Sequence, residues 1–282
     1  MRFIFWDFIG SEQSKPEHLI PANQRADPVI TSNDRCPELP LLCGPGRLSL
    51  REKTVHVWVL NDSRIEQVCA ALAQTLSPDE RQRAHSYKLE KDRVRFIARR
   101  SALRSLIGRY LNCRGESLRF RIAPFGKLAL QQPDAARLAF NVSQTDGTAL
   151  LAFAWDCHVG VDVERLIGGM EVTGIGREVF SSIEEAALDA ARPDSGATFF
   201  STWVRKESLL KALGTGLSGE PRSYTTRNDS QLGVGRWSAS HKGAALTGWT
   251  CLDIVLGPEF RGSLAVSLDS ARVSLNLFAL ST

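Results

Sequence analysis

Near its middle the chain reads Val159-Gly160-Val161-Asp162-Val163-Glu164-Arg165, so apolar residues alternate with Gly160, Asp162 and Glu164. This alternation is the period of a β-strand with one buried face. Asp162 and Glu164 project from the same side of such a strand, where they repel each other unless a positive charge lies between them. Two oxygen ligands at this spacing suit Mg²⁺. The simpler interpretation is a half-exposed strand whose acidic residues face water.

A second stretch, about forty residues further on, adds weight to the metal-site interpretation. Residues 198–213 have the apolar period of a helix, and Gly214 and Gly216 follow it. On this helix Glu207 and Lys211 lie four residues apart and share a face. They are either an exposed ion pair, or a third carboxylate directed at the strand with a lysine one turn later. The second arrangement is suited to a metal ion that holds a pyrophosphate.

Composition limits the class of protein. The chain has 282 residues, and its 43% hydrophobic and 23% charged residues are typical of a globular protein with a sizeable core. A net charge of +4 is too mild to indicate a general nucleic-acid binder. The six cysteines show no CxxC pair, which favours free thiols in a reducing compartment. We find no signal peptide or membrane span and expect a soluble, cytoplasmic protein.

The order of the expected elements indicates an α+β fold. Residues 1–50 are punctuated by prolines and are predicted to form an irregular extension, to which we assign no role. Strands are expected at 54–60, 117–122, 140–145, 149–155, 249–254 and 264–268, and helices at 65–76, 79–110 with a break, from 181, and at 198–213. Helices and strands therefore occur in a similar order on both sides of Trp155, which suggests a duplicated unit.

One face of the expected helix at 79–110 is basic. Only Glu90 and Asp92 oppose its positive residues between 81 and 104, which are Arg81, Arg83, Lys88, Lys91, Arg93, Arg95, Arg99, Arg100 and Arg104. This face is a solvated helix surface, a site for the phosphates of a small ligand, or a site for a nucleic-acid backbone. Aromatic residues suited to base stacking do not accompany the charges, which disfavours binding of single strands.

The two stretches together resemble the paired signature of 4'-phosphopantetheinyl transferases, in particular the surfactin-synthetase-activating type. Residues 160–164 fit the pattern G-[VI]-D-[VI]-E, and residues 203–211 fit W-x-x-K-E-[SA]-x-x-K. Supporting segments stand in the expected order, namely Phe96–Arg100, Pro124–Lys127, Phe140–Ser143 and Ala212–Ser218. The resemblance covers roughly residues 54–225.

The resemblance implies a pseudo-dimer of two similar halves, each an antiparallel sheet packed with a long helix. We expect the halves at residues 51–155 and 156–282, with the active site in the cleft between them. The implied reaction moves the 4'-phosphopantetheine arm of coenzyme A to a serine of an apo acyl or peptidyl carrier protein and releases adenosine 3',5'-bisphosphate. The implied metal ion is Mg²⁺, with Mn²⁺ as an alternative.

The resemblance also implies roles for single residues. Asp162, Glu164 and Glu207 match the metal ligands; Glu207 also matches the base that takes the serine proton, and Lys211 the lysine that assists the leaving group. The residues that match or fit contacts to coenzyme A phosphates are Lys91, Arg95, Arg100, Lys127, Ser143 and Gln144. Gln144 stands where the family often has histidine, and glutamine can donate a hydrogen bond but carries no charge.

Two other functions remain open from the sequence. A member of the same fold could bind coenzyme A or a carrier protein without catalysis, and the basic helix alone would suit a nucleic-acid module. We expect a monomer that binds neither nucleic acid nor membranes. Which class of carrier is modified, whether of fatty-acid, polyketide or peptide synthesis, is not predicted.

Overall fold

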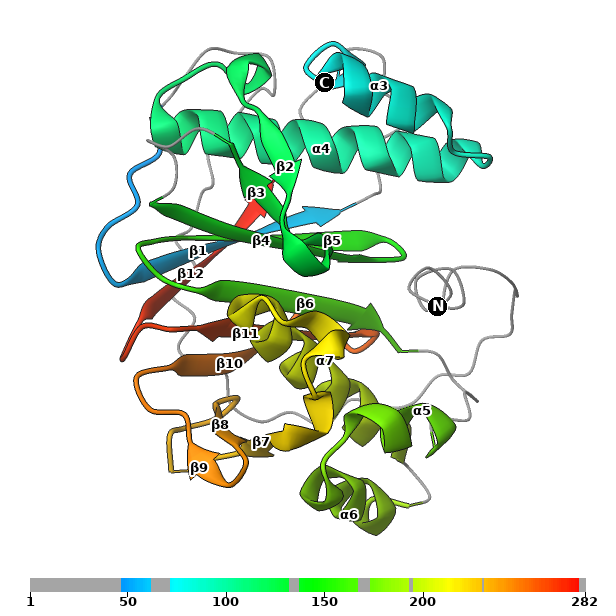
Figure 1. The fold of residues 1–282 in the computed structure, drawn as a ribbon, viewed down its shortest axis with the longest axis vertical. Helices are drawn as coiled ribbons and strands as arrows, with labels where there is room; N and C mark the ends of the chain where they lie inside the picture. The colour runs from blue at the N-terminus through cyan, green and yellow to red at the C-terminus, as the bar shows by residue number, and fades with distance from the viewer. Residues whose placement is uncertain are drawn as a thin grey trace.

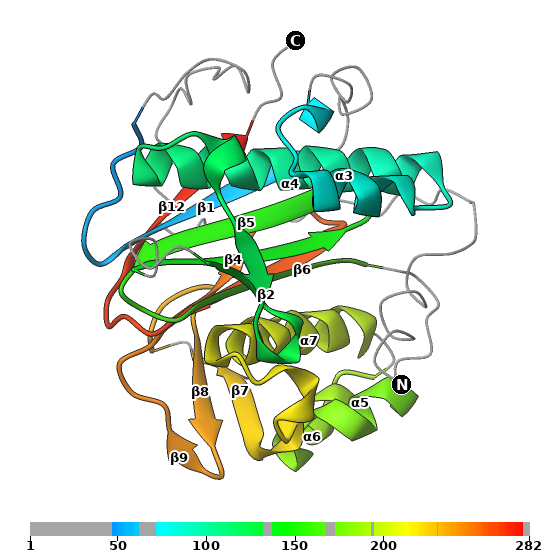
Figure 2. The same cartoon turned by 45° about the horizontal axis from the view of Figure 1, so that its top comes forward.

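The computed structural model describes residues 47–61, 72–131, 137–166, 173–192, 195–229 and 231–278. Two sheets stack between two long helices (Figures 1 and 2). The first sheet has the order β12-β1-β5-β4, with β1 at Thr54–Asn61, β4 at Leu138–Thr145, β5 at Thr148–Trp155 and β12 at Arg272–Phe278. The second has the order β10-β11-β6, with β6 at Val159–Arg165, β10 at Thr250–Ile254 and β11 at Phe260–Val266.

Each helix covers the outer face of one sheet. Helix α4 (Glu90–Leu111) packs on the first sheet through buried residues that include Ile97 and Leu106, against Trp58 and Phe153. Helix α7 (Ser195–Leu213) packs on the second, where Leu209 and Ala212 meet Ala265 and Cys251. The inner faces of the two sheets form a separate core of alternating residues, namely Val55, Val57, Leu150, Ala152, Val161, Val163 and Leu264. This alternation follows from the two-residue period of strands.

Smaller elements surround these layers. Helix α3 (Pro78–His85) precedes α4, and η2 (Gly115–Ser117), β2 (Phe120–Ile122), η3 (Pro124–Gly126) and β3 (Leu128–Leu130) follow it. Helices α5 (Thr173–Val179) and α6 (Ser182–Ala190) lead into α7. After α7 come η5 (Gly216–Ser218), η6 (Pro221–Ser223) and a third sheet of β7 (Tyr224–Asn228), β8 (Trp237–His241) and β9 (Ala244–Ala245).

The predicted α+β pseudo-dimer is confirmed, with one correction to its sheets. Strand β12 pairs in parallel with β1, so the first sheet is not wholly antiparallel and takes its edge strand from the end of the chain. A division of the chain at residue 155 stays a prediction, but it assigns this strand to the other half. The extension at 1–50 and the helix at 65–76 lie largely outside the described residues.

One predicted helix has the break that was expected, and one predicted strand is shorter than expected. The break in the helix at 79–110 lies between α3 and α4, where the Ser86 hydroxyl donates to the Arg83 carbonyl at the end of α3 and Leu89 takes an extended conformation before α4. The strand at 117–122 starts only at Phe120, since residues 115–117 form a 3-10 turn. Among the helices of the described ranges, none is both long and apolar enough to span a membrane.

A glycine allows α7 to lie directly on β6. A Cβ atom on Gly160 would come within 2.0 Å of the Ser208 carbonyl oxygen and 2.4 Å of the Ala212 nitrogen, both backbone atoms of α7. No side-chain rotation relieves such contacts, so any larger residue separates the helix from the strand. Because the two acidic residues of β6 follow Gly160, this contact sets their distance from α7.

We therefore predict that Gly160→Ala lowers the free energy of unfolding by about 1–3 kcal/mol or more, the cost of overpacking a close contact. Gly196→Ala in the same helix is the matched control, since a Cβ there meets nothing within 4 Å. It should raise stability by roughly 0.4–1 kcal/mol. Denaturant unfolding of both variants measures the difference, and equal effects would contradict the close packing of α7 on β6.

Candidate active site

The acidic residues of β6 lie beneath α7. Asp162 is 2% exposed, Glu164 is half-buried, and both are on the strand face that α7 covers, together with Gly160. Glu207 and Lys211, one turn apart on α7, complete the cluster, since the pKa values of Glu207 and Glu164 both respond to the charges of Asp162 and Lys211. The two sequence stretches are thus brought together as predicted.

Lys211 and Ser143 bind the same carboxylate oxygen. The Lys211 ammonium donates to Asp162 Oδ1 at 2.6 Å and to Ser143 Oγ at 3.1 Å. The Ser143 hydroxyl donates to Asp162 Oδ1 at 2.7 Å. A strand of the first half, a strand of the second half and α7 therefore meet at one oxygen atom. The simpler interpretation of Glu207 and Lys211 as an isolated surface pair is wrong, because Lys211 is bonded across to β6.

Burial among like charges raises the pKa of two acidic residues. Burial raises the pKa of Glu207 to about 7, although Lys211 opposes the rise and Asp162 adds to it. Burial and then the charge of Asp162 raise the pKa of Glu164 to about 8. Burial would lower the pKa of Lys211, but the carboxylates of Asp162, Glu207 and Glu164 outweigh it and the pKa is raised. One ammonium thus faces three carboxyl groups.

Two buried carboxylate oxygens of this cluster have no hydrogen-bond partner among the described residues. They are Asp162 Oδ2 and Glu207 Oε1. Buried carboxylate oxygens without a donor are costly, and a divalent cation with oxygen ligands relieves that cost. The donor set therefore fits Mg²⁺. The side chains are not already gathered around one point, since no three His, Cys, Asp or Glu residues in the described ranges form a ready metal cluster. Ligation by Asp162, Glu164 and Glu207 stays a prediction.

Lys127 is bonded within the chain. Its ammonium donates to the Lys211 carbonyl oxygen at 2.9 Å and weakly to the Val159 carbonyl oxygen at 3.4 Å. Burial lowers the pKa of Lys127. A cation at the last turn of a helix stabilises the carbonyl groups that have no partner there. Lys127 therefore caps α7 and joins the turn before β3 to the second half, and its contact with a phosphate stays a prediction.

The basic helix is partly neutralised. The Arg100 and Arg104 guanidinium groups both contact the buried Glu80 carboxylate, at 3.1 and 2.7 Å, so Arg100 is held at the α3–α4 contact. Arg95 pairs with Asp146 at 2.6 Å, in the turn between β4 and β5. Lys91 is exposed at the start of α4. These contacts favour neither the phosphate site nor the nucleic-acid surface over a solvated face.

Gln144 and Ser143 are neighbours on β4 but point in opposite directions. Ser143 faces β6, while Val142, on the same side as Gln144, packs against the α4 core. The structure does not bring Gln144 to the carboxylates. Thr145, on the Ser143 side, was missed by the sequence analysis. Its hydroxyl lies 3.5 Å from Glu164 Oε2. Because Thr145 lies two residues after Ser143, the two-residue period of a strand places both on the same face, and this signal was present in the sequence.

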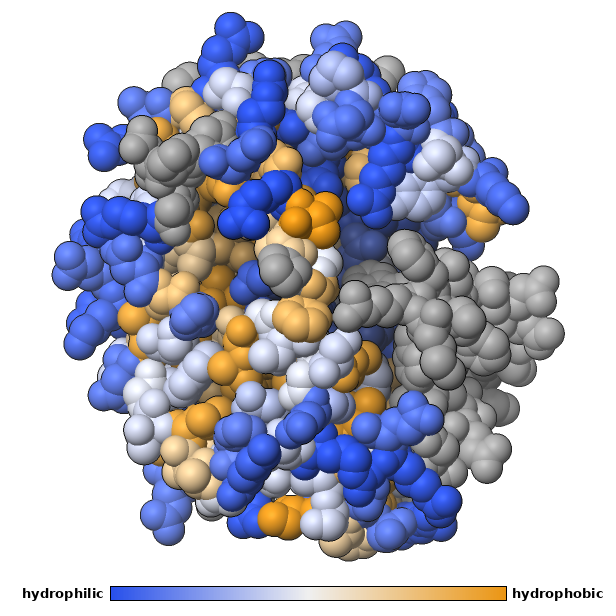
Figure 3. Space-filling model, in the orientation of Figure 1, coloured by the Kyte–Doolittle hydropathy of each residue, from blue (hydrophilic) through white to orange (hydrophobic). Residues whose placement is uncertain are grey.

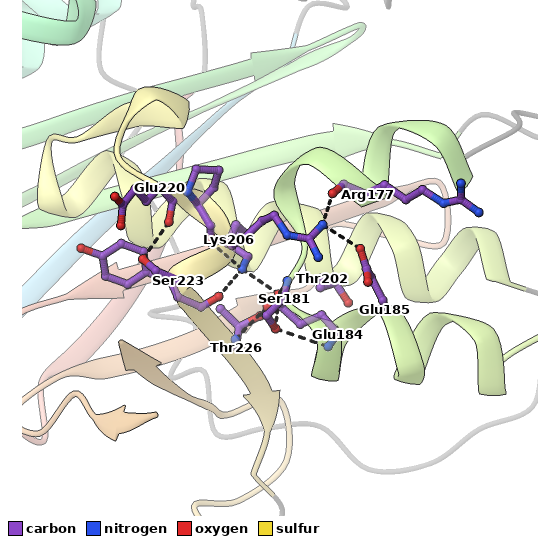
Figure 4. Close-up of polar contacts among 12 residues, drawn as sticks. Arg177, Ser181, Glu184, Glu185, Thr202, Lys206, Glu220, Ser223 and Thr226 are labelled. Atoms are coloured by element: carbon purple, nitrogen blue, oxygen red, sulfur yellow. Dashed lines mark hydrogen bonds and ion pairs between the residues drawn. The ribbon is translucent and has the colours of Figure 1, made fainter. Parts of the chain in front are cut away.

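Buried ion pairs fix α7 in place next to Glu207. Figure 4 shows Lys206 between Glu184 of α6 and the segment before β7. Its ammonium contacts Glu184 Oε2 at 2.6 Å, the Pro221 carbonyl oxygen at 3.0 Å and the Tyr224 carbonyl oxygen. Glu184 also accepts hydrogen bonds from Ser181 and Thr226. Lys206 is fully buried, so its charge is compensated within this network.

Arg205, the residue before Lys206, is anchored to Asp253 and Asn228. Arg205 Nε donates to Asp253 Oδ1 at 2.8 Å, and its Nη2 donates to Asn228 Oδ1 at 2.9 Å. Ser208 contacts Ser263 of β11 at 3.3 Å. Three of the four residues 205–208 thus hold the helix turn on the second half. The remaining one, Glu207, is directed at β6. This arrangement provides a carboxyl group that can take a proton near pH 7 and an ammonium group beside it.

Known proteins are similar to this chain in sequence. A profile of the 4'-phosphopantetheinyl transferase superfamily matches residues 158–261, which include β6 and α7. The chain is 33% identical over 177 residues to the 4'-phosphopantetheinyl transferase HetI of Nostoc sp., which covers 62% of this chain and 74% of that protein. It is 28% identical over 163 residues to the 4'-phosphopantetheinyl transferase Sfp of Bacillus subtilis, over 56% of this chain and 70% of that protein.

A human protein named L-aminoadipate-semialdehyde dehydrogenase-phosphopantetheinyl transferase is 26% identical over 168 residues, 56% of this chain and 54% of its own length. Relatives of this one class thus come from bacteria and from humans. The family profile, at residues 158–261, covers Asp162, Glu164, Glu207 and Lys211. Because the chain is 33% identical to HetI over 74% of that protein, and because the family profile matches, the chain belongs to the 4'-phosphopantetheinyl transferase superfamily of enzymes.

Proposed function

We propose that the protein transfers the 4'-phosphopantetheine arm of coenzyme A to a serine of an apo acyl or peptidyl carrier protein, with Mg²⁺ as the required cation. The observation that carries this proposal is the buried cluster in which one ammonium group of the described residues, that of Lys211, faces Asp162, Glu164 and Glu207. Such a cluster needs further positive charge. A divalent cation supplies this charge, and a pyrophosphate bound with it supplies oxygen ligands to the cation.

In the proposed reaction the carrier serine oxygen forms a bond to the phosphorus that bears the pantetheine arm. The bond from this phosphorus to the bridging oxygen breaks, and adenosine 3',5'-bisphosphate leaves. Glu207 accepts the serine proton. Lys211 stabilises the negative charge that develops on the phosphate oxygens. Its bond to Asp162 keeps the ammonium in place.

The residues that would hold the cation are Asp162, Glu164 and Glu207, and Mn²⁺ is expected to replace Mg²⁺. When bound, the cation supplies positive charge to the pyrophosphate oxygens. The unpartnered Asp162 Oδ2 and Glu207 Oε1 support this assignment. Lys91, Arg95, Arg100, Lys127 and Gln144 remain proposed phosphate contacts.

An apolar surface beside the cluster supports a protein substrate. Ile122 and Phe125, 62% and 55% exposed, lie on the β2–η3 segment directly before Lys127, which is bonded to α7. Figure 3 shows apolar side chains across the middle of this face, between the two halves. Contiguous exposed apolar patches, unlike single exposed residues, mark sites of protein contact. We propose that the carrier docks here. The monomeric state, the cytoplasmic location and the absence of nucleic-acid or membrane binding stay predictions.

The second candidate is a protein that binds coenzyme A or a carrier without catalysis. It is favoured by the internal bonds of Lys127 and Arg100, which engage two of the expected phosphate ligands. The two candidates differ in turnover, so they are separated by the following measurement.

Glu207→Gln is expected to lower kcat for transfer to an apo carrier by about 100-fold or more, because the proton acceptor is lost. The dissociation constant for coenzyme A should change far less, since the side chain keeps its size. Mass spectrometry of the carrier measures transfer, and calorimetry measures binding. Glu90→Gln, an exposed residue at the start of α4, is the matched control and should keep the wild-type rate. If the wild-type protein modifies none of several folded apo carriers but binds coenzyme A, the non-catalytic candidate is correct.

The metal-free protein should lose stability as the pH rises. The pKa values of Glu207 and Glu164 are raised to about 7 and about 8, so the folded state holds protons that the unfolded state has released. Their contribution to stability is therefore present below about pH 4.5 and is lost as the pH rises to about 8. Thermal unfolding in EDTA between pH 5 and pH 8.5 measures this loss. Because cations bind the deprotonated carboxylates, Mg²⁺ should stabilise the protein more at pH 8 than at pH 6. Equal stabilisation at both pH values would contradict binding at these residues.

A further inference from the structure

Side-chain oxygens of β4 replace a backbone ladder between the two halves. Asn141 Oδ1 accepts a hydrogen bond from the Val161 N–H at 3.0 Å. Ser143 Oγ accepts from the Val163 N–H at 3.3 Å, and Thr145 Oγ1 accepts from the Arg165 N–H at 3.2 Å. We call these three contacts the β4–β6 seam. They recur every second residue on both strands, so each seam residue of β4 faces one defined peptide group of β6.

Two of the three seam residues also contact a carboxylate. Ser143 Oγ lies 2.7 Å from Asp162 Oδ1, and Thr145 Oγ1 lies 3.5 Å from Glu164 Oε2. In both cases the carboxylate belongs to the residue that precedes the bonded N–H. The third seam residue, Asn141, meets the N–H that follows Gly160, where there is no side chain. The seam therefore pairs one hydroxyl group with each acidic residue of β6.

The direction of the Ser143 hydroxyl follows from its neighbours. A serine hydroxyl has one proton to donate and two lone pairs to accept with. The Val163 N–H and the Lys211 ammonium are both donors to Ser143 Oγ, so they use the lone pairs. The proton is left for Asp162 Oδ1, the remaining contact. A phosphate oxygen, which needs a donor, finds none on Ser143 unless this bond breaks.

This bond also determines which oxygen of Asp162 remains available. Ser143 and Lys211 both donate to Oδ1, whereas the buried Oδ2 has no partner in the part of the chain that the structure describes. With Oδ1 held, the carboxylate cannot rotate without losing both hydrogen bonds. Oδ2 is therefore kept as the free ligand atom. Hydrogen bonds to metal-ligating groups orient the ligands in this way, and their loss weakens metal binding about 10–100-fold.

We propose that Ser143 and Thr145 are positioning residues that orient Asp162 and Glu164 toward the cation. The proposal rests on the cation requirement of the proposed function. Ser143 has the larger effect, since its bond to the carboxylate is the shorter one. Asn141 has only the structural role of holding the seam together.

Binding of Mn²⁺ alone to the full chain, measured by electron paramagnetic resonance without coenzyme A, tests the proposal. Ser143→Ala is expected to weaken Mn²⁺ binding about tenfold or more, and Thr145→Val by a smaller factor. Ser143→Thr keeps the hydroxyl and should restore wild-type affinity. Asn141→Ala is the matched control, because it removes a seam acceptor but touches no carboxylate. It should lower stability in denaturant unfolding and leave the Mn²⁺ affinity within about twofold of wild type.

Three outcomes overturn the proposal. The first is wild-type Mn²⁺ affinity in Ser143→Ala with a raised KM for coenzyme A, which would make Ser143 a phosphate ligand. The second is equal weakening in Asn141→Ala, which would make the whole seam merely structural. The third is a wild-type protein that does not bind Mn²⁺. Should Ser143→Ala fail to fold, Ser143→Cys keeps the size of the side chain with a weaker donor and is expected to show the same loss.

The proposed function fails or stands by a different measurement, the modification of apo carriers by the wild-type protein. A protein that binds Mn²⁺ in the expected order of variants but modifies no carrier would retain the positioning roles and refute the transferase assignment. A protein that modifies carriers while Ser143→Ala binds Mn²⁺ as wild type does would retain the transferase assignment and refute the positioning roles.

Discussion

The contact between β4 and β6 is the constraint on which the position of the site depends. The two strands belong to different sheets, yet the N–H groups of β6 are bonded by side chains of β4, at Asn141, Ser143 and Thr145. Because strand side chains alternate between faces, a shift of β4 by one residue would direct these polar groups into the α4 core and Val142 toward β6. The seam therefore fixes the register between the halves. Asp162 and Lys211, which come from one half, meet Ser143 of the other only in this register.

Helix α7 determines the other side of the site. Its close approach to β6 depends on the missing side chain at Gly160, and its rotation depends on Arg205 and Lys206, which are bonded to elements of the second half. Neighbouring residues on a helix point about 100° apart, so anchoring Arg205, Lys206 and Ser208 leaves one direction for Glu207. The buried pair of Lys206 and Glu184 lies outside the acidic cluster, but it holds the helix that carries two members of that cluster. The Glu184 carboxylate accepts four hydrogen bonds and forms one ion pair with Lys206, so its charge is satisfied. The pair therefore holds α7 in position and takes no part in the chemistry.

Local patterns predicted the main elements and the members of the cluster. The alternation around Asp162 gave the strand, and the four-residue spacing of Glu207 and Lys211 gave the shared helix face. The uses of the basic residues were not predictable, because they depend on partners that are distant in the sequence. Lys127 meets a carbonyl oxygen 84 residues away, and Arg100 meets Glu80, which from the sequence alone was only an acidic residue in the first turn of a helix. The parallel pairing of β12 with β1 joins the two ends of the described chain, and no periodicity within either strand indicates it.

The distribution of unsatisfied charge separates the site from the rest of the protein. Elsewhere the buried charges are matched, since Glu80 has two arginines and Glu184 has a lysine and four other donors. Among buried side-chain polar atoms of the described residues, four lack a partner, and the two that belong to carboxylates are both in this cluster. The buried carboxylates Glu80 and Glu184 both have donors, so the fold is able to satisfy buried charges. The unsatisfied oxygens of the cluster therefore indicate a site that a ligand completes. Among the described residues, the deficit of positive charge lies where β6, β4 and α7 meet, and unsatisfied groups of this kind persist where a bound ligand completes them.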